Sequence, residues 1–155
     1  MQPGVNWGDQ LRKFTPRACK VIQLAEKQAL RLGHPFVGTE HLLIGLLEIG
    51  DNGVAQGVLK RSGVELHAVC AAVEKCVGRG PDTPIELMLP TPRLKRVFDL
   101  AREEAAKLSH TYVGTEDLLL AILREGRGVG VRSLKMLDAD LNRIAEEIRR
   151  EIGST

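Results

Sequence analysis

Two glutamates at matching places in a repeated hexapeptide are the residues in this chain whose chemistry is easiest to name. Gly38-Thr39-Glu40-His41-Leu42-Leu43 returns as Gly114-Thr115-Glu116-Asp117-Leu118-Leu119. Two carboxylates facing one cleft can act as general acid and base, as they do in glycoside hydrolases. A glutamate in the first turn of a helix is also stabilised by about 0.3–1 kcal/mol through the helix dipole, without any ligand. The hexapeptide by itself leaves both roles open.

The histidines and cysteines do not have the spacing of a metal site. His41 and His67 show no ligand spacing with the three cysteines, and no second cysteine pair accompanies Cys70 and Cys76. We therefore predict no metal. His34 and His110 each precede the repeated hexapeptide and are expected to fix the loop by hydrogen bonds. An odd number of cysteines without a secretory signal predicts buried, reduced thiols.

The hexapeptide belongs to a longer internal duplication. Residues 14–50 align with 90–126 at an offset of 76, and nearly half of the aligned positions are identical. After a one-residue deletion, the apolar positions Leu66, Val69 and Val73 align with Leu141, Ile144 and Ile148. Conserved apolar positions in two copies indicate one supersecondary unit that is present twice and shares a core.

Apolar residues at spacings of three and four predict helices throughout both copies. We expect helices over 16–32, 40–49, 54–61, 65–77, 92–108, 116–125, 129–137 and 140–152. Thr15 and Thr91 are predicted N-caps, each followed by a proline that suits the first helical position, and Thr39 is a third predicted cap. The fold class is therefore all-α, with eight helices as two four-helix repeats related by a pseudo-twofold axis.

The predicted organisation is one domain with a short lead-in. Residues 1–13 are expected to be flexible, and 14–152 form the domain. Repeat one covers 14–77, a linker covers 78–90, and repeat two covers 91–152. The linker holds Ile85, Leu87, Met88 and Leu89, which we expect to pack back as extended chain. A turn is predicted at residues 50–53, where Gly, Asp and Asn gather.

Composition excludes several classes of function. The 155 residues carry a net charge of +2, with acidic and basic residues interleaved, which offers no basis for bulk binding to nucleic acid or a membrane. No segment approaches the roughly 20 apolar residues of a membrane span, so we expect a cytoplasmic protein. A helix-turn-helix DNA binder would suit the short helices but lacks a basic recognition helix. No G-x-x-x-x-G-K-[ST] motif occurs.

The doubled pattern resembles a known family. FTPRA and LGHPFVGTEHLL, followed by TPR and LSHTYVGTEDLL, resemble the Clp N-terminal repeat of Clp-type AAA+ unfoldases, most closely the ClpC branch. The resemblance implies an eight-helix, non-catalytic domain without a cofactor. It would receive adaptor and substrate proteins and pass them to a Clp ATPase ring and protease. The chain would then be either part of such an unfoldase or a free-standing protein acting on a Clp complex in trans.

In the ClpC branch the resemblance also implies a receptor for phosphoarginine, a degradation mark. Carried over by motif position, Glu40 and Glu116 would bind guanidinium groups, while Thr15, Thr91 and Lys95 would lie near the phosphate. A carboxylate suits a planar guanidinium, and a capped helix N-terminus suits a phosphate. Pro16 and Pro92 each lack an N–H, so cations at the helix start would have to complete the anion site. The candidate cations are Arg17, Arg93 and Lys95.

The two predicted pockets are not equivalent. Asp117 stands where the first copy has His41, and Cys19 aligns with Lys95. Extra negative charge at Asp117 would oppose a phosphate. We therefore expect Glu40 to mark the working site. The alternative of a carboxylate-pair hydrolase requires that Glu40 and Glu116 face one cleft.

Overall fold

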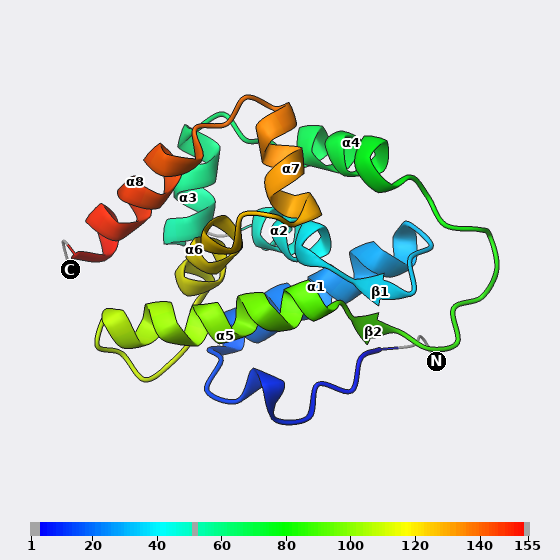
Figure 1. Ribbon diagram of the computed structural model, residues 1–155, viewed down its shortest axis with the longest axis horizontal. Coiled ribbons are helices and arrows are strands. Elements are labelled where there is room, and N and C mark those ends of the chain that lie inside the picture. The colour runs from blue at the N-terminus through cyan, green and yellow to red at the C-terminus, as the bar shows by residue number, and fades with distance from the viewer. Residues whose placement is uncertain (1–3, 51–52, 154–155) are drawn as a thin grey trace.

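The computed structural model describes residues 4–50 and 53–153, and in these ranges a helix is present at each predicted place, with its ends within one residue of the prediction (Figure 1). The helices are α1 (Pro16–Arg31), α2 (Thr39–Glu48), α3 (Val54–Arg61), α4 (Leu66–Val77), α5 (Pro92–Lys107), α6 (Thr115–Glu125), α7 (Val129–Met136) and α8 (Leu141–Gly153). A 3-10 helix, η1 (Gly8–Leu11), precedes them, and β1 (Phe36–Val37) and β2 (Leu89–Pro90) are two-residue strands. The predicted all-α fold is confirmed.

Two of the three predicted caps are present and one is wrong. The Thr15 and Thr91 hydroxyls accept hydrogen bonds from the N–H groups of Ala18 and Leu94, each at 3.0 Å. Gly38, not Thr39, is the N-cap of α2. The buried hydroxyl of Thr39 instead accepts a 3.1 Å bond from the Gly130 N–H at the start of α7. Thr39 therefore joins the two repeats, because α7 packs directly on this end of α2.

The repeats are interlocked. Within each repeat the first helix packs on the second, α1 on α2 and α5 on α6. The later helices pack between repeats, α3 on α8 and α4 on α7. The strands cross in the same way: β1 of repeat one pairs in parallel with β2, and Phe14 pairs in parallel with Val113. Advancing Phe14 and Val37 by 76 residues gives Pro90 and Val113, so the two crossings are pseudo-twofold copies.

The linker and the lead-in both contact the helices. The Gly80 N–H donates to the Leu32 carbonyl at 2.8 Å, and Met88 is buried, whereas Leu87 and Leu89 are 65% and 45% exposed. The predicted packing of the linker thus holds for Met88 but not for its two neighbours. In the lead-in, the Trp7 ring lies 5.6 Å from that of Phe98. Residues 1–3 of the lead-in, and Asp51 and Asn52 of the predicted turn, lie outside the described residues.

Two smaller expectations can be compared with the structure. Cys19, Cys70 and Cys76 are free thiols, as predicted, but are half-buried rather than buried. None of the helices in the described ranges has both the length and the hydropathy needed to cross a bilayer.

Helix α2 lies at the centre of the domain, and a glycine lets α1 approach it closely. Leu42, Leu43 and Ile44 are fully buried. A Cβ on Gly45 would lie 2.6 Å from the carbonyl oxygen of Val21 on α1, closer than carbon and oxygen tolerate. Repeat two has Ala121 at the matching position. The α1–α2 contact is therefore the tighter of the two.

Replacing Gly45 by alanine should destabilise the fold by about 1–3 kcal/mol, because the new methyl group forces α1 and α2 apart. The matched control is Gly57→Ala on α3, where a Cβ would meet only the flexible end of Arg61 at 3.2 Å. That change should be neutral or stabilising by up to about 1 kcal/mol. Urea unfolding of the three proteins measures both effects, and equal stability of the two variants would contradict the close approach.

Candidate functional site

Each of the repeated glutamates folds back over the glycine that precedes it. A Cβ on Gly38 would lie 2.2 Å from Oε1 of Glu40, and one on Gly114 would lie 2.7 Å from Oε1 of Glu116. The carboxylates therefore occupy the space that a side chain would need at these glycines. This explains why glycine and glutamate recur together in both copies.

Glu40 is a buried carboxylate, with 9% of its surface exposed. Burial raises its pKa, and the opposing effects of its own backbone N–H and of His34 are smaller. No Lys or Arg side chain in the described part of the chain forms an ion pair with it. A buried carboxylate of this kind is a strong acceptor for a cationic hydrogen-bond donor from outside. Glu116 is half-buried and more accessible.

The strand crossing brings each glutamate beside the threonine of the other repeat. The Thr91 N–H donates to the Val37 carbonyl at 2.9 Å, and the Thr15 N–H donates to the Val113 carbonyl at 2.9 Å. Val37 and Val113 each precede the Gly-Thr-Glu motif by one residue. The start of α2, with Glu40, is therefore held beside the start of α5, with Thr91, and the start of α6, with Glu116, beside the start of α1, with Thr15.

The crossing also distributes the cation candidates unequally. Lys95, in the first turn of α5, is exposed and follows Thr91, so it belongs to the Glu40 site. Its counterpart in the Glu116 site is Cys19, on the first turn of α1. One site thus has a cationic side chain where the other has a thiol. The predicted inequivalence of the two pockets has a basis in the side chains that the fold groups together.

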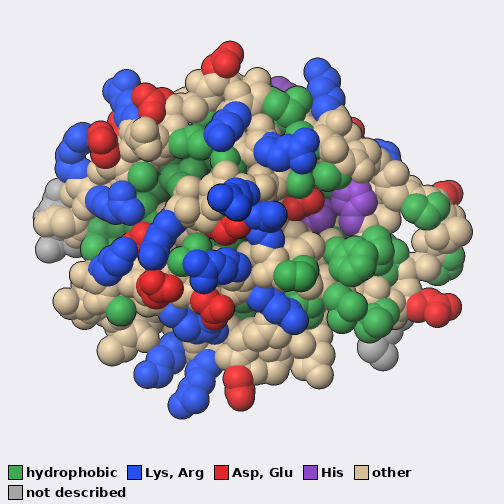
Figure 2. All heavy atoms as spheres, viewed as in Figure 1, with side chains coloured by type: hydrophobic (Ala, Val, Ile, Leu, Met, Phe, Trp, Pro, Cys, Tyr) green, Lys and Arg blue, Asp and Glu red, His purple; other side chains and the backbone are tan. Residues whose placement is uncertain are grey.

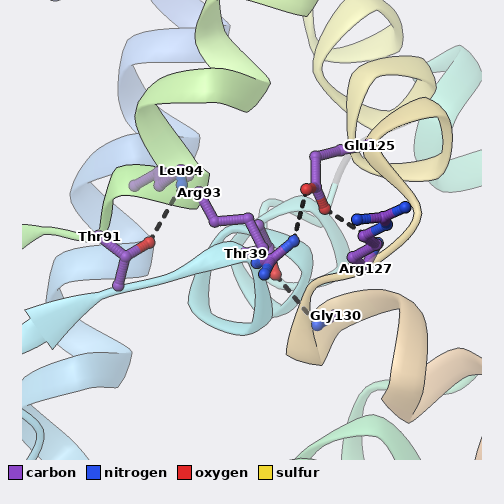
Figure 3. Close-up of polar contacts among 7 residues, drawn as sticks. All are labelled: Thr39, Thr91, Arg93, Leu94, Glu125, Arg127 and Gly130. Atoms are coloured by element: carbon purple, nitrogen blue, oxygen red, sulfur yellow. Dashed lines mark hydrogen bonds and ion pairs between the residues drawn. The ribbon is translucent and has the colours of Figure 1, made fainter.

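The two arginines that follow the capping threonines are engaged elsewhere. Arg93 forms a 2.6 Å ion pair with Glu125 at the end of α6, and Figure 3 shows its side chain extending past Thr39, away from Thr91. Glu125 also accepts a 2.9 Å bond from the Arg127 N–H. Arg17 packs against Gly53, where a Cβ would lie 2.1 Å from its guanidinium. In this structure both guanidinium groups lie at the ends of neighbouring helices.

His34 and His41 form a chain of hydrogen bonds next to Glu40, and only the role of His34 was predicted. The Gly38 N–H donates to Nδ1 of His41 at 2.9 Å, and Nε2 of His41 lies 3.0 Å from Nδ1 of His34. Nε2 of His34 then lies 2.8 Å from the Gly78 carbonyl. Because Nδ1 of His41 accepts from the Gly38 N–H and the Gly78 carbonyl only accepts, Nε2 is the donating nitrogen of both imidazoles. His34 therefore fixes its loop, as predicted. His41 also belongs to this hydrogen-bond chain, and its only signal in the sequence is its place in the repeated hexapeptide.

In repeat two, His110 and Asp117 occupy the places of His34 and His41. Nδ1 of His110 lies 2.8 Å from the Tyr112 carbonyl, so His110 also fixes its loop. Oδ2 of Asp117 accepts a 2.8 Å bond from the Gly114 N–H. Burial raises the pKa of Asp117 to about 6. A buried carboxylate thus stands where repeat one has a neutral imidazole.

The surface around the Glu40 site is partly apolar. Phe36 on β1 is 51% exposed, and Leu87, just before β2, and Leu89, within β2, are also exposed. Figure 2 shows hydrophobic side chains gathered beside histidine on the side of the molecule where β1 and β2 lie. Lys and Arg side chains on the same face are interspersed with carboxylates.

Comparison with known proteins gives consistent matches. A model of the Clp repeat (R) N-terminal domain family matches residues 13–153. The chain is 48% identical over 144 residues to the ClpA homolog of Guillardia theta and to the chloroplastic chaperone protein ClpC1 of Oryza sativa subsp. japonica. These alignments cover 92% of this chain but 17% and 16% of the relatives, so the chain spans about one sixth of their length.

Two solved structures with the same fold are N-terminal domains of Clp proteins. The N-terminal domain of ClpD from Arabidopsis thaliana matches with a TM-score of 0.76 at 26% identity, covering 92% of this chain and 99% of that one. A ClpV N-domain in complex with a VipB peptide matches with a TM-score of 0.73 at 17% identity, covering 100% and 97% of the two chains.

Acidification should weaken the fold through His41. Burial and the neighbouring His34 lower the pKa of His41 from 6.5 to about 3. Between these values the unfolded chain binds a proton that the folded chain does not. The stabilisation is therefore complete above pH 6.5 and is lost as the pH falls towards 3, by up to about 1.4 kcal/mol per pH unit.

The test compares urea unfolding of the wild type and His41→Asn across this range. Asparagine keeps an acceptor for the Gly38 N–H but does not titrate, so its stability should fall less steeply with decreasing pH. The raised pKa of Asp117 acts with the opposite sign between 3.8 and about 6, and is present in both proteins. The difference between the two slopes isolates His41, and parallel slopes would contradict the assignment.

Proposed function

This chain belongs to the family of Clp repeat N-terminal domains, and from that premise we propose that it is a non-catalytic module that binds substrate and adaptor proteins for a ClpC-like ATP-dependent unfoldase. We further propose that the Glu40 site recognises phosphoarginine on proteins marked for degradation. The observation that carries the second proposal is the buried Glu40 carboxylate, which no Lys or Arg of the described chain neutralises by an ion pair.

The proposed contacts divide between the two ends of the ligand. The guanidinium would donate a charge-assisted pair of hydrogen bonds to Glu40, where burial strengthens the interaction. The phosphate would lie at the N-terminus of α5, near the Thr91 hydroxyl and the exposed Lys95 ammonium. Pro92 at the first helical position supplies no N–H, which gives Lys95 a larger share of the anion binding.

The surroundings of the site support a ligand carried by a protein. Phe36 directly precedes the segment that leads to Glu40, and Leu89 lies two residues before Thr91. Both are exposed apolar side chains at the rim of the site. They offer contacts for the residues that flank a modified arginine, whereas a free amino acid would leave them unused. The VipB peptide bound to the ClpV N-domain is a related case of peptide binding on this fold.

The second site, with Glu116 and Thr15, is the weaker one in this proposal. Cys19 there replaces the cation, and Asp117 adds negative charge close to Glu116. Arg17 and Arg93 are proposed as secondary contributors, since each would first have to leave its present neighbour. A carboxylate-pair hydrolase gains no support, because the two glutamates start different helices and each stands beside a different threonine.

The module would act in the same way in either molecular setting. As part of a longer chain, like the relatives of which it spans one sixth, it would present cargo to an attached ATPase ring. As a free-standing protein it would compete for or deliver cargo in trans. Joining the module to a ring raises the local concentration of cargo at the pore, so the two settings differ in rate rather than in recognition.

Titration of free phosphoarginine by calorimetry tests the recognition. The wild type should show saturable binding, dominated by one site. Glu40→Gln and Lys95→Ala should each weaken it by about 10- to 100-fold, the loss expected for a hydrogen bond to a charged partner. Lys107→Ala, an exposed lysine at the far end of α5, is the matched control and should bind like the wild type.

Unmodified arginine and phosphoserine complete this experiment, because each carries only one end of the ligand and should bind far more weakly. Absence of saturable phosphoarginine binding by the wild type would eliminate the recognition proposal and leave protein docking. Equal loss in Glu116→Gln and Glu40→Gln would contradict the assigned inequality of the two sites.

A further inference from the structure

A cleft of about 860 Å³ lies between the lead-in and the C-terminal part of α5. The lead-in follows α5 on its way to the start of α1 (Figure 1). Ala105 on α5 and Val113 before α6 are buried and give the cleft an apolar floor. A cavity of this size, with apolar surface and a few polar groups at its edge, has the dimensions of a ligand site.

Cations dominate the charged side chains that line this cleft. Arg12 and Lys13 come from the lead-in and Arg102 comes from α5, against one carboxylate, that of Asp9. Arg12 and Lys13 are exposed, and neither forms an ion pair with another residue in the described part of the chain. Such cations beside an apolar floor favour a ligand that is anionic and carries small apolar groups.

The loop between α5 and α6 forms the other side of the cleft. Ser109 and Thr111 are exposed there, and their hydroxyls form no hydrogen bond with other described residues. His110 between them is already engaged, since Nδ1 lies 2.8 Å from the Tyr112 carbonyl and Nε2 lies 3.5 Å from Oδ1 of Asp117. A hydroxyl both donates and accepts, so the two free hydroxyls can serve the N–H and carbonyl groups of a bound backbone.

The corresponding place in repeat one is filled by the protein's own side chains. At the offset of 76, three charged residues of the lead-in match three apolar residues of the linker: Asp9 matches Ile85, Arg12 matches Met88 and Lys13 matches Leu89. Met88 is 1% exposed, and Ile85 packs against the core. Arg12, at the place of the buried Met88, is exposed instead. Repeat two therefore lacks the side chains that close this place in repeat one, and its cleft is open and cationic.

The lead-in side of the cleft is held in position. The Val113 N–H donates to the Lys13 carbonyl at 2.9 Å. The Arg102 guanidinium donates to the Gln10 carbonyl and lies 5.4 Å from the centre of the Phe14 ring. A cleft whose walls are already fixed loses little conformational freedom when a ligand binds, and this favours affinity.

We propose that this cleft binds an extended acidic segment of a partner protein. Neighbouring side chains of an extended peptide point to opposite sides. Acidic residues can therefore face Arg12, Lys13 and Arg102, while small residues between them cover Ala105 and Val113. The loop hydroxyls then meet the peptide backbone. Ion pairs at a surface are individually weak, so the number of acidic residues determines the affinity.

A peptide suits the cleft better than a small anion does. A phosphate ion can pair with one or two of the cations, but it leaves the apolar floor and most of the 860 Å³ unused. The cations, the apolar surface and the hydroxyls also lie along one cleft and do not surround one point, because they come from the lead-in, from α5 and from the loop that follows it. An extended ligand reaches all three.

This inference rests on the proposed role as a module that binds substrate and adaptor proteins, but not on phosphoarginine recognition. None of the residues lining the cleft is among those proposed to bind phosphoarginine. The two surfaces can therefore be tested separately, and either can fail while the other holds. A partner that carries both an acidic segment and a phosphoarginine gains affinity because the two contacts are linked.

Fluorescence anisotropy with the fluorescein-labelled peptide Ala-Glu-Ala-Asp-Ala-Glu tests the proposal. The wild type should bind this peptide saturably, and the affinity should fall as the salt concentration rises, because exposed charges are screened. The unlabelled peptide should compete for the site. The neutral peptide Ala-Gln-Ala-Asn-Ala-Gln, the basic peptide Ala-Lys-Ala-Lys-Ala-Lys and inorganic phosphate should not compete, measured at constant ionic strength.

Variants locate the binding. Arg12→Gln and Lys13→Gln should each weaken it about two- to fivefold, and the double variant about tenfold. Arg132→Gln and Lys135→Gln change exposed cations of α7 and are the matched controls, which should bind like the wild type. Glu40→Gln should also bind like the wild type, which separates this result from that of the phosphoarginine titration. Circular dichroism verifies that each variant is folded.

Several results would overturn the assignment. Absence of saturable binding, equal competition by the neutral peptide, or wild-type affinity in the Arg12→Gln, Lys13→Gln double variant would each do so. Displacement by inorganic phosphate at constant ionic strength would assign the cleft to a small anion instead. A dimer in sedimentation velocity that dissociates in the double variant would assign it to a second copy of this chain.

Discussion

The crossing of two short backbone segments between the repeats is the constraint on which the rest of this structure depends. The Thr91 N–H donates to the Val37 carbonyl, and the Thr15 N–H donates to the Val113 carbonyl. In each repeat, the segment before the first helix therefore lies along the segment before the second helix of the other repeat. This pairing brings together the N-termini of two helices, one from each repeat, at each candidate site. Each of the two candidate glutamate sites is consequently built from both repeats.

The packing around this crossing leaves little freedom. Gly38 and Gly114 make room for the carboxylates that fold over them, and the Thr39 hydroxyl holds the start of α7. These contacts bury Glu40 and Asp117 in surroundings where a charge is poorly solvated, and the pKa of each is raised. A carboxylate buried in this way interacts more strongly with a cation than one in water does, because the local dielectric is lower. The residues that stabilise this crossing therefore include the residues for which ligand binding is proposed.

One exchange between the copies makes the two sites chemically different. With histidine at position 41, the polar groups behind Glu40 form a closed hydrogen-bonded chain that ends on the linker carbonyl of Gly78. With aspartate at position 117, the corresponding groups next to Glu116 are a buried carboxylate and the His110 imidazole, whose Nε2 lies 3.5 Å from Oδ1 of Asp117. A duplicated framework can in this way keep its backbone while its buried polar groups change, since the helices and caps do not depend on which side chain accepts the glycine N–H.

The sequence by itself was enough to predict the eight helices, from the spacing of apolar residues, and the Thr15 and Thr91 caps. It also showed the duplication, in which Glu40 and Glu116 occupy equivalent positions. These features are local or repeat at a constant offset, so they can be read without knowing which segments meet. Only the tertiary structure decided which threonine lies beside which glutamate motif. It also decided that the Thr39 hydroxyl accepts from the Gly130 N–H instead of capping its own helix, and that Arg93 forms an ion pair with Glu125. It also brought His110 up against Asp117. These pairings depend on strand crossing and helix packing between repeats. Contacts between segments that are distant in the sequence produce no periodic pattern in it, so they could not be predicted.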